Sequence, residues 1–205
     1  KIDKEFGLNE IKTDGIDAII AADSGMDFLY ENGVTPDIIV GDFDSATTKA
    51  LEFFERKGQT EIHRLNPIKD DTDTEYAIRL AIREGARSIV LLGATGSRID
   101  HVLGNISLLG IGLESGTDIS IIDTNNRIRM ADKPVTIEKS AQYGRFVSLI
   151  AVTDDNEVSL RGFKYPVTDY SFDRFTSLGI SNEIVDDHAL IDIHRGKFII
   201  IESKD

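Results

Sequence analysis

Acidic residues follow several apolar runs of this sequence directly. The clearest case is 40-VGDFDSA-46, in which Asp42 and Asp44 come straight after Ile38, Ile39 and Val40. This pair could belong to an ordinary surface turn, because Gly and Asp both favour turns. Crowded carboxylates repel one another, however, and a bound cation relieves that repulsion. Oxygen ligands in a chain without cysteine are suited to Mg²⁺, which commonly binds together with substrate phosphates.

Three further polar clusters follow apolar runs, at 23-DSG-25, 66-NPIKDDTDTE-75 and 93-GATGSRIDH-101. If the preceding strands are parallel, all the clusters lie at one edge of a sheet, where ligands bind in open α/β sheets. The acids expected to crowd there are Asp23, Asp42, Asp44, Asp70, Asp71, Asp73 and Asp100. We therefore predict a site for a hard divalent cation at this edge.

Groups suited to phosphate occur in the same clusters. The glycines of residues 93–96 leave backbone N–H groups to face an anion at a helix N-terminus. Arg98 offers a planar fork for phosphate oxygens, and Lys69 offers a second positive charge. The ordinary alternatives are a tight turn, a solvated lysine and, for Thr72, a helix N-cap. Neither G-x-x-x-x-G-K-[ST] nor G-x-G-x-x-G occurs, so a nucleotide would be held by another device.

Alternating strands and helices are predicted to position these groups, up to about Asn125. Apolar strands are expected at 17–22, 37–40, 61–65, 88–92 and 118–122, and helices at 24–32, 49–57, 72–84 and 100–113. Thr72 and Glu75 form a capping-box pattern, and Gly85 marks the end of that helix. Continuous apolar strands between helices favour a parallel sheet covered on both faces.

Short β-rich runs replace the helices after about Asn125. They lie at 127–130, 135–138, 146–152, 157–161, 189–193 and 197–202, with Gly, Pro, Asp and Asn between them. This spacing is typical of an all-β sandwich or barrel. We therefore predict two domains: an α/β domain with a mainly parallel sheet flanked by helices over residues 1–125, and an all-β sandwich over residues 126–205.

The composition excludes several classes of function. The chain has 205 residues, of which 40% are hydrophobic and 29% charged, as in ordinary globular proteins. Its net charge of −13 disfavours nucleic acid as a partner. The absence of cysteine excludes disulfides, thiolate catalysis and Cys-based zinc sites. No apolar run approaches the roughly 20 residues of a membrane span, and the charged residues 1–10 do not form a signal peptide, so we expect a cytoplasmic protein.

The ordered set of motifs resembles the thiamine pyrophosphokinase family in its bacterial form. The matching stretches are 21-AADSG-25, 36-PDIIVGDFDS-45, 69-KDDTDTE-75, 93-GATGSRIDH-101, 162-GFKYPV-167 and 177-SLGISNE-183. Members of this family join an α/β nucleotide domain to a C-terminal β-sandwich and work as homodimers. The resemblance implies transfer of the β,γ-pyrophosphoryl group of ATP to the hydroxyethyl oxygen of thiamine, which gives thiamine diphosphate and AMP.

The resemblance also implies the residues that bind Mg²⁺ and the phosphates. Asp42, Asp44 and Asp73 correspond to the Mg²⁺-binding acids of the family. Asp23 and Thr72 correspond to positions near the phosphates and the metal. The metal would neutralise charge on the triphosphate, since this chemistry depends on positioning and electrostatics.

Further residues are implied on the ATP and thiamine sides. Arg98 and Asp100 match an Arg-x-Asp pair that lines both substrates, and Asp100 could orient the thiamine hydroxyl or accept its proton. Ser181 and Asn182 match the motif that meets thiamine. In this family thiamine lies between the first domain of one subunit and the β-domain of the other.

Two alternatives to this function stay open. One is a pyrophosphokinase for another hydroxymethyl acceptor, such as a pterin, although 177-SLGISNE-183 favours thiamine. The other is a non-catalytic thiamine- or nucleotide-binding protein, although a mere binder has little need for so many clustered charges. Family members usually begin with an extra strand and a Gly-containing loop that touches ATP. Residues 1–15 look too short and too polar to supply both, so the resemblance assigns no residues to this part of the adenosine-side contact.

Overall fold

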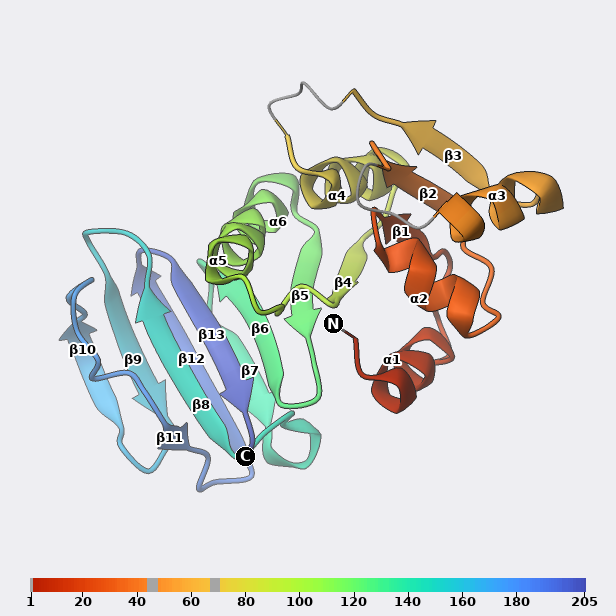
Figure 1. The fold of residues 1–205 in the computed structure, drawn as a ribbon. Coiled ribbons are helices and arrows are strands. Elements are labelled where there is room, and N and C mark those ends of the chain that lie inside the picture. The colour runs from red at the N-terminus through yellow and green to blue at the C-terminus, as the bar shows by residue number, and fades with distance from the viewer. Residues whose placement is uncertain (1, 44–47, 67–70) are drawn as a thin grey trace. The chain divides into compact units, whose positions relative to one another are not determined.

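The computed structural model describes residues 2–43, 48–66 and 71–205, which form two compact units (Figure 1). The units comprise residues 1–89 and 90–205, so the division falls within strand β4 (Ser88–Leu92). The sequence predicts that helices give way to short strands at about Asn125. This position lies between β5 (Asp118–Ile122) and β6 (Asn126–Ala131), away from the division between the two units. Compactness and element type divide the chain by different criteria, so the domain boundary at residue 125 stays a prediction.

A three-stranded parallel sheet forms the centre of the first unit, in the order β1-β2-β3. Its strands are β1 (Ile20–Ala22), β2 (Ile38–Gly41) and β3 (Glu61–Arg64). The helices around it are α2 (Gly25–Glu31), α3 (Thr48–Lys57) and α4 (Asp73–Arg83). Strands and helices share a core of Ala21, Met26, Leu29, Ile39, Ala50 and Phe54. The predicted α/β architecture with a parallel sheet is confirmed.

Helix α1 (Lys4–Ile11) is an element that the sequence pattern does not predict. Asp3 caps it, since its side chain accepts a hydrogen bond of 3.0 Å from the backbone N–H of Phe6. Ile11 packs against the core of the first unit. The helix was missed because its few apolar residues give only a weak helical periodicity.

The second unit contains two sheets that pack face to face as a sandwich (Figure 1). The larger sheet has the order β11-β8-β13-β6-β5-β4, and the smaller has the order β10-β9-β12-β7. The strands not yet described are β7 (Val135–Glu138), β8 (Phe146–Ala151), β9 (Glu157–Arg161), β10 (Val167–Ser171), β11 (Asn182–Glu183), β12 (His188–Arg195) and β13 (Phe198–Ser203). Side chains of both sheets meet in one core, so the predicted β-sandwich is confirmed.

Strands β4 and β5 differ from the prediction in their partners. They lie at the edge of the larger sheet of the second unit, where β5 pairs antiparallel with β6, and not in the parallel sheet. An apolar run indicates burial but does not identify the neighbouring strand, which explains the error. The predicted helix at 100–113 is divided at Leu109 into α5 (Ile99–Leu108) and α6 (Gly110–Ser115). Across the described ranges, helices fall short of the length and apolar character that a membrane crossing requires.

A carboxylate is buried inside the sandwich, on β13. Glu202 shares one face of this strand with the core residues Phe198 and Ile200, and it has no exposed surface. Its oxygens accept hydrogen bonds of 2.9 and 2.8 Å from Arg127, 3.2 Å from Arg129 and 2.9 Å from the backbone N–H of Tyr143. The charge is therefore compensated inside the protein, as burial of an ion requires. This network fixes the connection between β7 and β8 onto the larger sheet.

Candidate active site

Three carboxylates of the first unit meet at one edge of the parallel sheet. Asp23 follows β1, Asp42 follows β2, and Asp73 is the first residue of α4. Each carboxylate contributes one oxygen atom to a group of three, and these three atoms all lie within 4.8 Å of one another. The structure thus brings together three of the acids that were expected to crowd at this edge. Their role as metal ligands stays a prediction.

The backbone explains how Asp23 and Asp42 come so close. Strands β1 and β2 are parallel neighbours, and the backbone N–H of Asp23 donates a 2.8 Å hydrogen bond to the carbonyl of Val40. Gly41 leaves space at this point, since a Cβ atom there would lie 3.2 Å from the Phe43 ring and 3.4 Å from the Cα of Asp23. Asp23 and Phe43 adopt left-handed φ angles of 46° and 63°. Such backbone strain in non-glycine residues is concentrated at functional sites.

The electrostatics of Asp23 favour a cation. Its Oδ1 atom is buried and lacks a hydrogen-bond partner among the described residues. Burial raises the pKa of this carboxyl group, and the charges of Asp73, Asp42 and Asp27 raise it further, against a hydrogen bond from the backbone of Ser24. A divalent cation would remove both the repulsion and the unmet demand for a donor. The ligand set is made of oxygen atoms, so it fits Mg²⁺.

The start of α4 is held by two side-chain contacts. Thr72 is its N-cap, as predicted, and the Oγ1 atom of Thr72 accepts a 3.2 Å hydrogen bond from the backbone N–H of Glu75. Tyr76 contributes a second contact, which the sequence pattern did not reveal: its hydroxyl lies 3.1 Å from Nδ1 of His63 on β3. Both contacts stabilise the helix end that carries Asp73. The predicted contact of Thr72 with phosphate stays a prediction.

Three predicted residues of these loops, Asp44, Lys69 and Asp70, lie outside the described residues. Asp71 is described and is exposed to solvent. The roles of Asp44 as a metal ligand and of Lys69 as a phosphate contact therefore stay predictions.

Arg98 and Asp100 form an exposed ion pair at the start of α5. The Nη2 and Nε atoms of Arg98 donate hydrogen bonds of 2.6 and 3.2 Å to the two oxygens of Asp100. The hydrogen bond from Arg98 lowers the pKa of Asp100 to about 2. A carboxylate with so low a pKa is a weak proton acceptor at neutral pH. The pair therefore favours an orienting role for Asp100 over proton abstraction.

Ser181 and Asn182 are neighbours with different surroundings. Asn182 is buried, and its side-chain amide accepts a 3.0 Å hydrogen bond from the backbone N–H of Tyr165 and donates one of 2.9 Å to the carbonyl of Tyr165. Ser181 is exposed and has a left-handed φ of 60°, with its backbone N–H donating to Ser148 Oγ at 3.0 Å. Asn182 thus fixes the 162–167 segment, whereas Ser181 presents its side chain outward. Their predicted contacts with thiamine stay predictions.

Two family models match this sequence in chain order. The model described as "Thiamin pyrophosphokinase, catalytic domain" matches residues 12–121, and "Thiamin pyrophosphokinase, vitamin B1 binding domain" matches residues 134–198. The curated "Thiamine pyrophosphokinase" of Bacillus subtilis (strain 168) is 35% identical over 188 residues. That alignment covers 91% of this chain and 87% of the relative.

Solved structures resemble the present one over its whole length. The crystal structure of thiamine pyrophosphokinase from Bacillus subtilis superposes with a TM-score of 0.88 at 32% identity, covering 100% of this chain and 94% of the other. Thiamin pyrophosphokinase from Geobacillus thermodenitrificans has a TM-score of 0.85 at 29% identity, with coverage of 100% and 92%. The similarity therefore extends from the α/β unit through the β-sandwich.

Proposed function

Because this chain belongs to the thiamine pyrophosphokinase family, we propose that its three-acid cluster binds Mg²⁺, and that this ion in turn binds the triphosphate of ATP during catalysis. The predicted activity, transfer of pyrophosphate from ATP to thiamine to give thiamine diphosphate and AMP, is the activity of this family and is confirmed at that level. The alternatives of a pterin acceptor and of a non-catalytic binder find no support in the comparisons.

One observation carries the proposed metal site: the buried Oδ1 atom of Asp23, beside Asp42 and Asp73, has no hydrogen-bond partner in the part of the chain that the structure describes. These three side chains would hold Mg²⁺, and Asp44 is predicted to join them. Bound there, Mg²⁺ would supply positive charge against the phosphate oxygens. The protein contributes a fixed arrangement of ligands, because the backbone holds the ends of β1 and β2 together and the side chains of Thr72 and Tyr76 hold the α4 N-terminus.

Arg98, Asp100 and Ser181 are proposed to act on the substrates. Arg98 would exchange one of its bonds to Asp100 for a phosphate oxygen, where its fork can bind in a bidentate manner. Asp100 would then orient the thiamine hydroxyl. Ser181, with its exposed side chain, is the stronger candidate of the 181–182 pair for direct contact with thiamine.

The activity is tested by incubating the purified chain with ATP, Mg²⁺ and thiamine. We expect thiamine diphosphate and AMP in equal amounts, measured by chromatography. Chelation of the metal should abolish both products, and a hydroxymethylpterin in place of thiamine should release no AMP. AMP release with the pterin alone, or binding of both substrates without any product, would contradict the proposal.

Replacement of Asp23 by asparagine is expected to stabilise the metal-free protein while it weakens metal binding. The change removes a half-buried charge that three neighbouring acids repel, so we expect a gain of about 1 kcal/mol or less, in the range of other relieved functional sites. Thermal unfolding in a chelator would measure this gain. Mg²⁺ should raise the Tm because it binds only the folded protein. The rise should be larger for the wild type than for the variant, because the variant binds the metal more weakly. Equal responses of both proteins to Mg²⁺ would exclude Asp23 as a ligand.

A homodimer in the cytoplasm, with thiamine bound at the subunit interface, is also proposed. It rests on the resemblance to the family, in which the two domains that meet thiamine come from different subunits. Light scattering of the purified chain should give twice the mass of one chain. A mass of one chain at the concentrations used for assay, with full activity, would contradict it.

A further inference from the structure

The loop between β4 and α5 is held at its base and exposed at its tip. In residues 93–98, Ala94 is buried and Thr95 is half-buried, whereas Ser97 and Arg98 are exposed. The exposed end leads directly into the Arg98–Asp100 ion pair. The position of this pair therefore depends on how firmly the base of the loop is held.

Two side chains from other segments hold the base. Asn105 on α5 donates a 2.9 Å hydrogen bond to the carbonyl of Ala94. Asp123, 28 residues beyond Thr95 in the chain, accepts a 2.6 Å hydrogen bond from the Thr95 hydroxyl through its Oδ2 atom. Hydrogen bonds from a hydroxyl to an ionised carboxylate are roughly twice as strong as neutral ones. The contact between Thr95 and Asp123 is therefore the stronger of the two.

Asp123 is itself fixed by the turn between β5 and β6. Its Oδ1 atom accepts hydrogen bonds of 2.8 Å from the backbone N–H groups of Asn125 and Asn126, and of 3.0 Å from the Asn126 side chain. Its carbonyl accepts a hydrogen bond from the hydroxyl of Tyr143. Burial alone would raise the pKa of Asp123, but the hydrogen bonds from Thr95, Asn125 and Asn126 outweigh it and lower the pKa. The carboxylate is thus ionised and cannot turn away without opening the turn.

We propose that Asp123 is a positioning residue, which fixes loop 93–98 through Thr95 and thereby sets the Arg98 fork for the phosphates of ATP. The inference rests on the proposed function, since that function places Arg98 on the nucleotide. A loop held in its binding position loses less conformational freedom when the substrate binds. The motif 93-GATGSRIDH-101 contains Thr95 but not its partner, so only the structure identifies Asp123.

The test compares steady-state kinetics of variants at Thr95 and Asp123. Thr95→Val keeps the shape of the side chain but removes the hydroxyl, and we expect kcat/KM for ATP to fall roughly 10- to 100-fold, as for small displacements of a catalytic group. Thr95→Ser keeps the hydroxyl and should retain the wild-type value. If Asp123 acts through Thr95, the double variant Thr95→Val/Asp123→Ala should lose no more than Asp123→Ala alone. Calorimetry with a non-hydrolysable ATP analogue gives a second readout. Thr95→Val should lower the affinity for the analogue, whereas Thr95→Ser should retain it.

A matched control is available in the turn between β8 and β9. The Thr153 hydroxyl donates a 2.5 Å hydrogen bond to the Asn156 side chain and accepts one of 3.1 Å from the backbone N–H of Lys197. Thr153→Val therefore removes a comparable hydroxyl contact away from loop 93–98. It should lower the Tm and leave kcat/KM for ATP unchanged.

The outcomes separate the positioning role from the proposed function. If kcat/KM for ATP is unchanged in Thr95→Val but falls in Arg98→Ala, the positioning role of Asp123 is overturned. The proposed contact of Arg98 with the nucleotide would then stand. If Arg98→Ala leaves kcat/KM for ATP unchanged, Arg98 does not contact the nucleotide. That result would overturn both the positioning role of Asp123 and the proposed role of Arg98. Equal losses in Thr95→Val and Thr95→Ser, or in Thr95→Val and Thr153→Val, would also overturn the positioning role, because general destabilisation would then explain them.

Discussion

Replacement of Asp42 by asparagine is expected to lower kcat roughly 10²- to 10³-fold at saturating substrates, as does the loss of other preorganised electrostatic groups. The change keeps the size and shape of the side chain and removes one charge from the group formed with Asp23 and Asp73. Fewer charged ligands would hold Mg²⁺ less tightly and place it less accurately against the phosphates. Turnover would be measured as AMP release, over a series of Mg²⁺ concentrations. A higher Mg²⁺ concentration should restore part of the lost rate.

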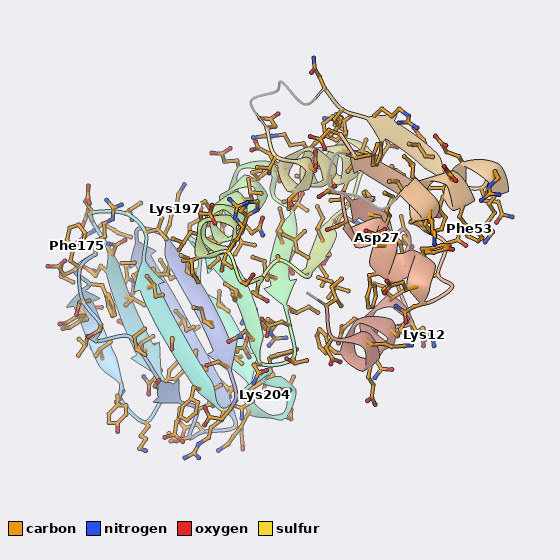
Figure 2. All side chains as sticks on the ribbon, viewed as in Figure 1. Lys12, Asp27, Phe53, Phe175, Lys197 and Lys204 are labelled. Carbon is orange, nitrogen blue, oxygen red and sulfur yellow. The ribbon has the colours of Figure 1, made fainter. Side chains whose placement is uncertain are left out.

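Asp27 provides the matched control for Asp42. It lies on α2 in the same unit (Figure 2), and its charge contributes to the raised pKa of Asp23, but it is outside the three-acid group. Asp27→Asn should therefore leave the rate unchanged while changing the net charge by the same amount. Wild-type turnover of Asp42→Asn at ordinary Mg²⁺ concentrations would remove Asp42 from the metal site. Equal losses in both variants would mean that the total charge, and not the ligand, matters.

Glu202→Ala is expected to lower the free energy of unfolding by about 3–5 kcal/mol, the usual cost of removing one partner of a buried ion pair. The variant would leave the partly buried guanidinium groups of Arg127 and Arg129 without their shared carboxylate. It would also leave the backbone N–H of Tyr143 without its acceptor. Burial already lowers the pKa of Arg129, although the charge of Glu202 opposes this, so its guanidinium is especially dependent on Glu202. Urea denaturation of the variant and the wild type would measure the difference.

An exposed ion pair of the same unit serves as the comparison. Nη1 of Arg174 lies 3.3 Å from Oδ1 of Asp154, and 51% and 89% of the two side-chain surfaces are exposed. Asp154→Ala should lower stability by about 0–1 kcal/mol, because water screens exposed charges. If both variants lost the same small amount, the Glu202 network would contribute little, and the sandwich would depend on its apolar core alone.

Local patterns predicted much of the fold and the first part of the site. Apolar runs followed by acids identified the ends of β1 and β2, because strand burial and polar loops both leave a mark in the sequence. The Thr72 N-cap was predicted for the same reason, since the cap and its partner Glu75 are only three residues apart. Asp23, Asp42 and Asp73 were predicted to converge once their strands were taken as parallel neighbours.

Contacts between distant segments could not be predicted in this way. Nothing near Asp123 in the sequence indicates Thr95, and nothing near His63 indicates Tyr76. Glu202 follows a run of apolar residues and would ordinarily be expected at the surface, because its partners Arg127 and Arg129 lie more than 70 residues away. The placement of β4 and β5 failed for the same reason, since strand pairing depends on residues elsewhere in the chain.

Strand β13 occupies a central place in the larger sheet, between β8 and β6, and pairs with both along its whole length. A ribosome therefore synthesises β6 and β8 well before the strand that joins them. Until residues 198–203 emerge, both neighbours expose unpaired backbone groups and the apolar side chains that β13 later covers. Long-range pairing of this kind folds slowly and leaves the chain prone to aggregation meanwhile. The second unit should therefore acquire its structure only after synthesis has passed Ser203, while the first unit can fold beforehand.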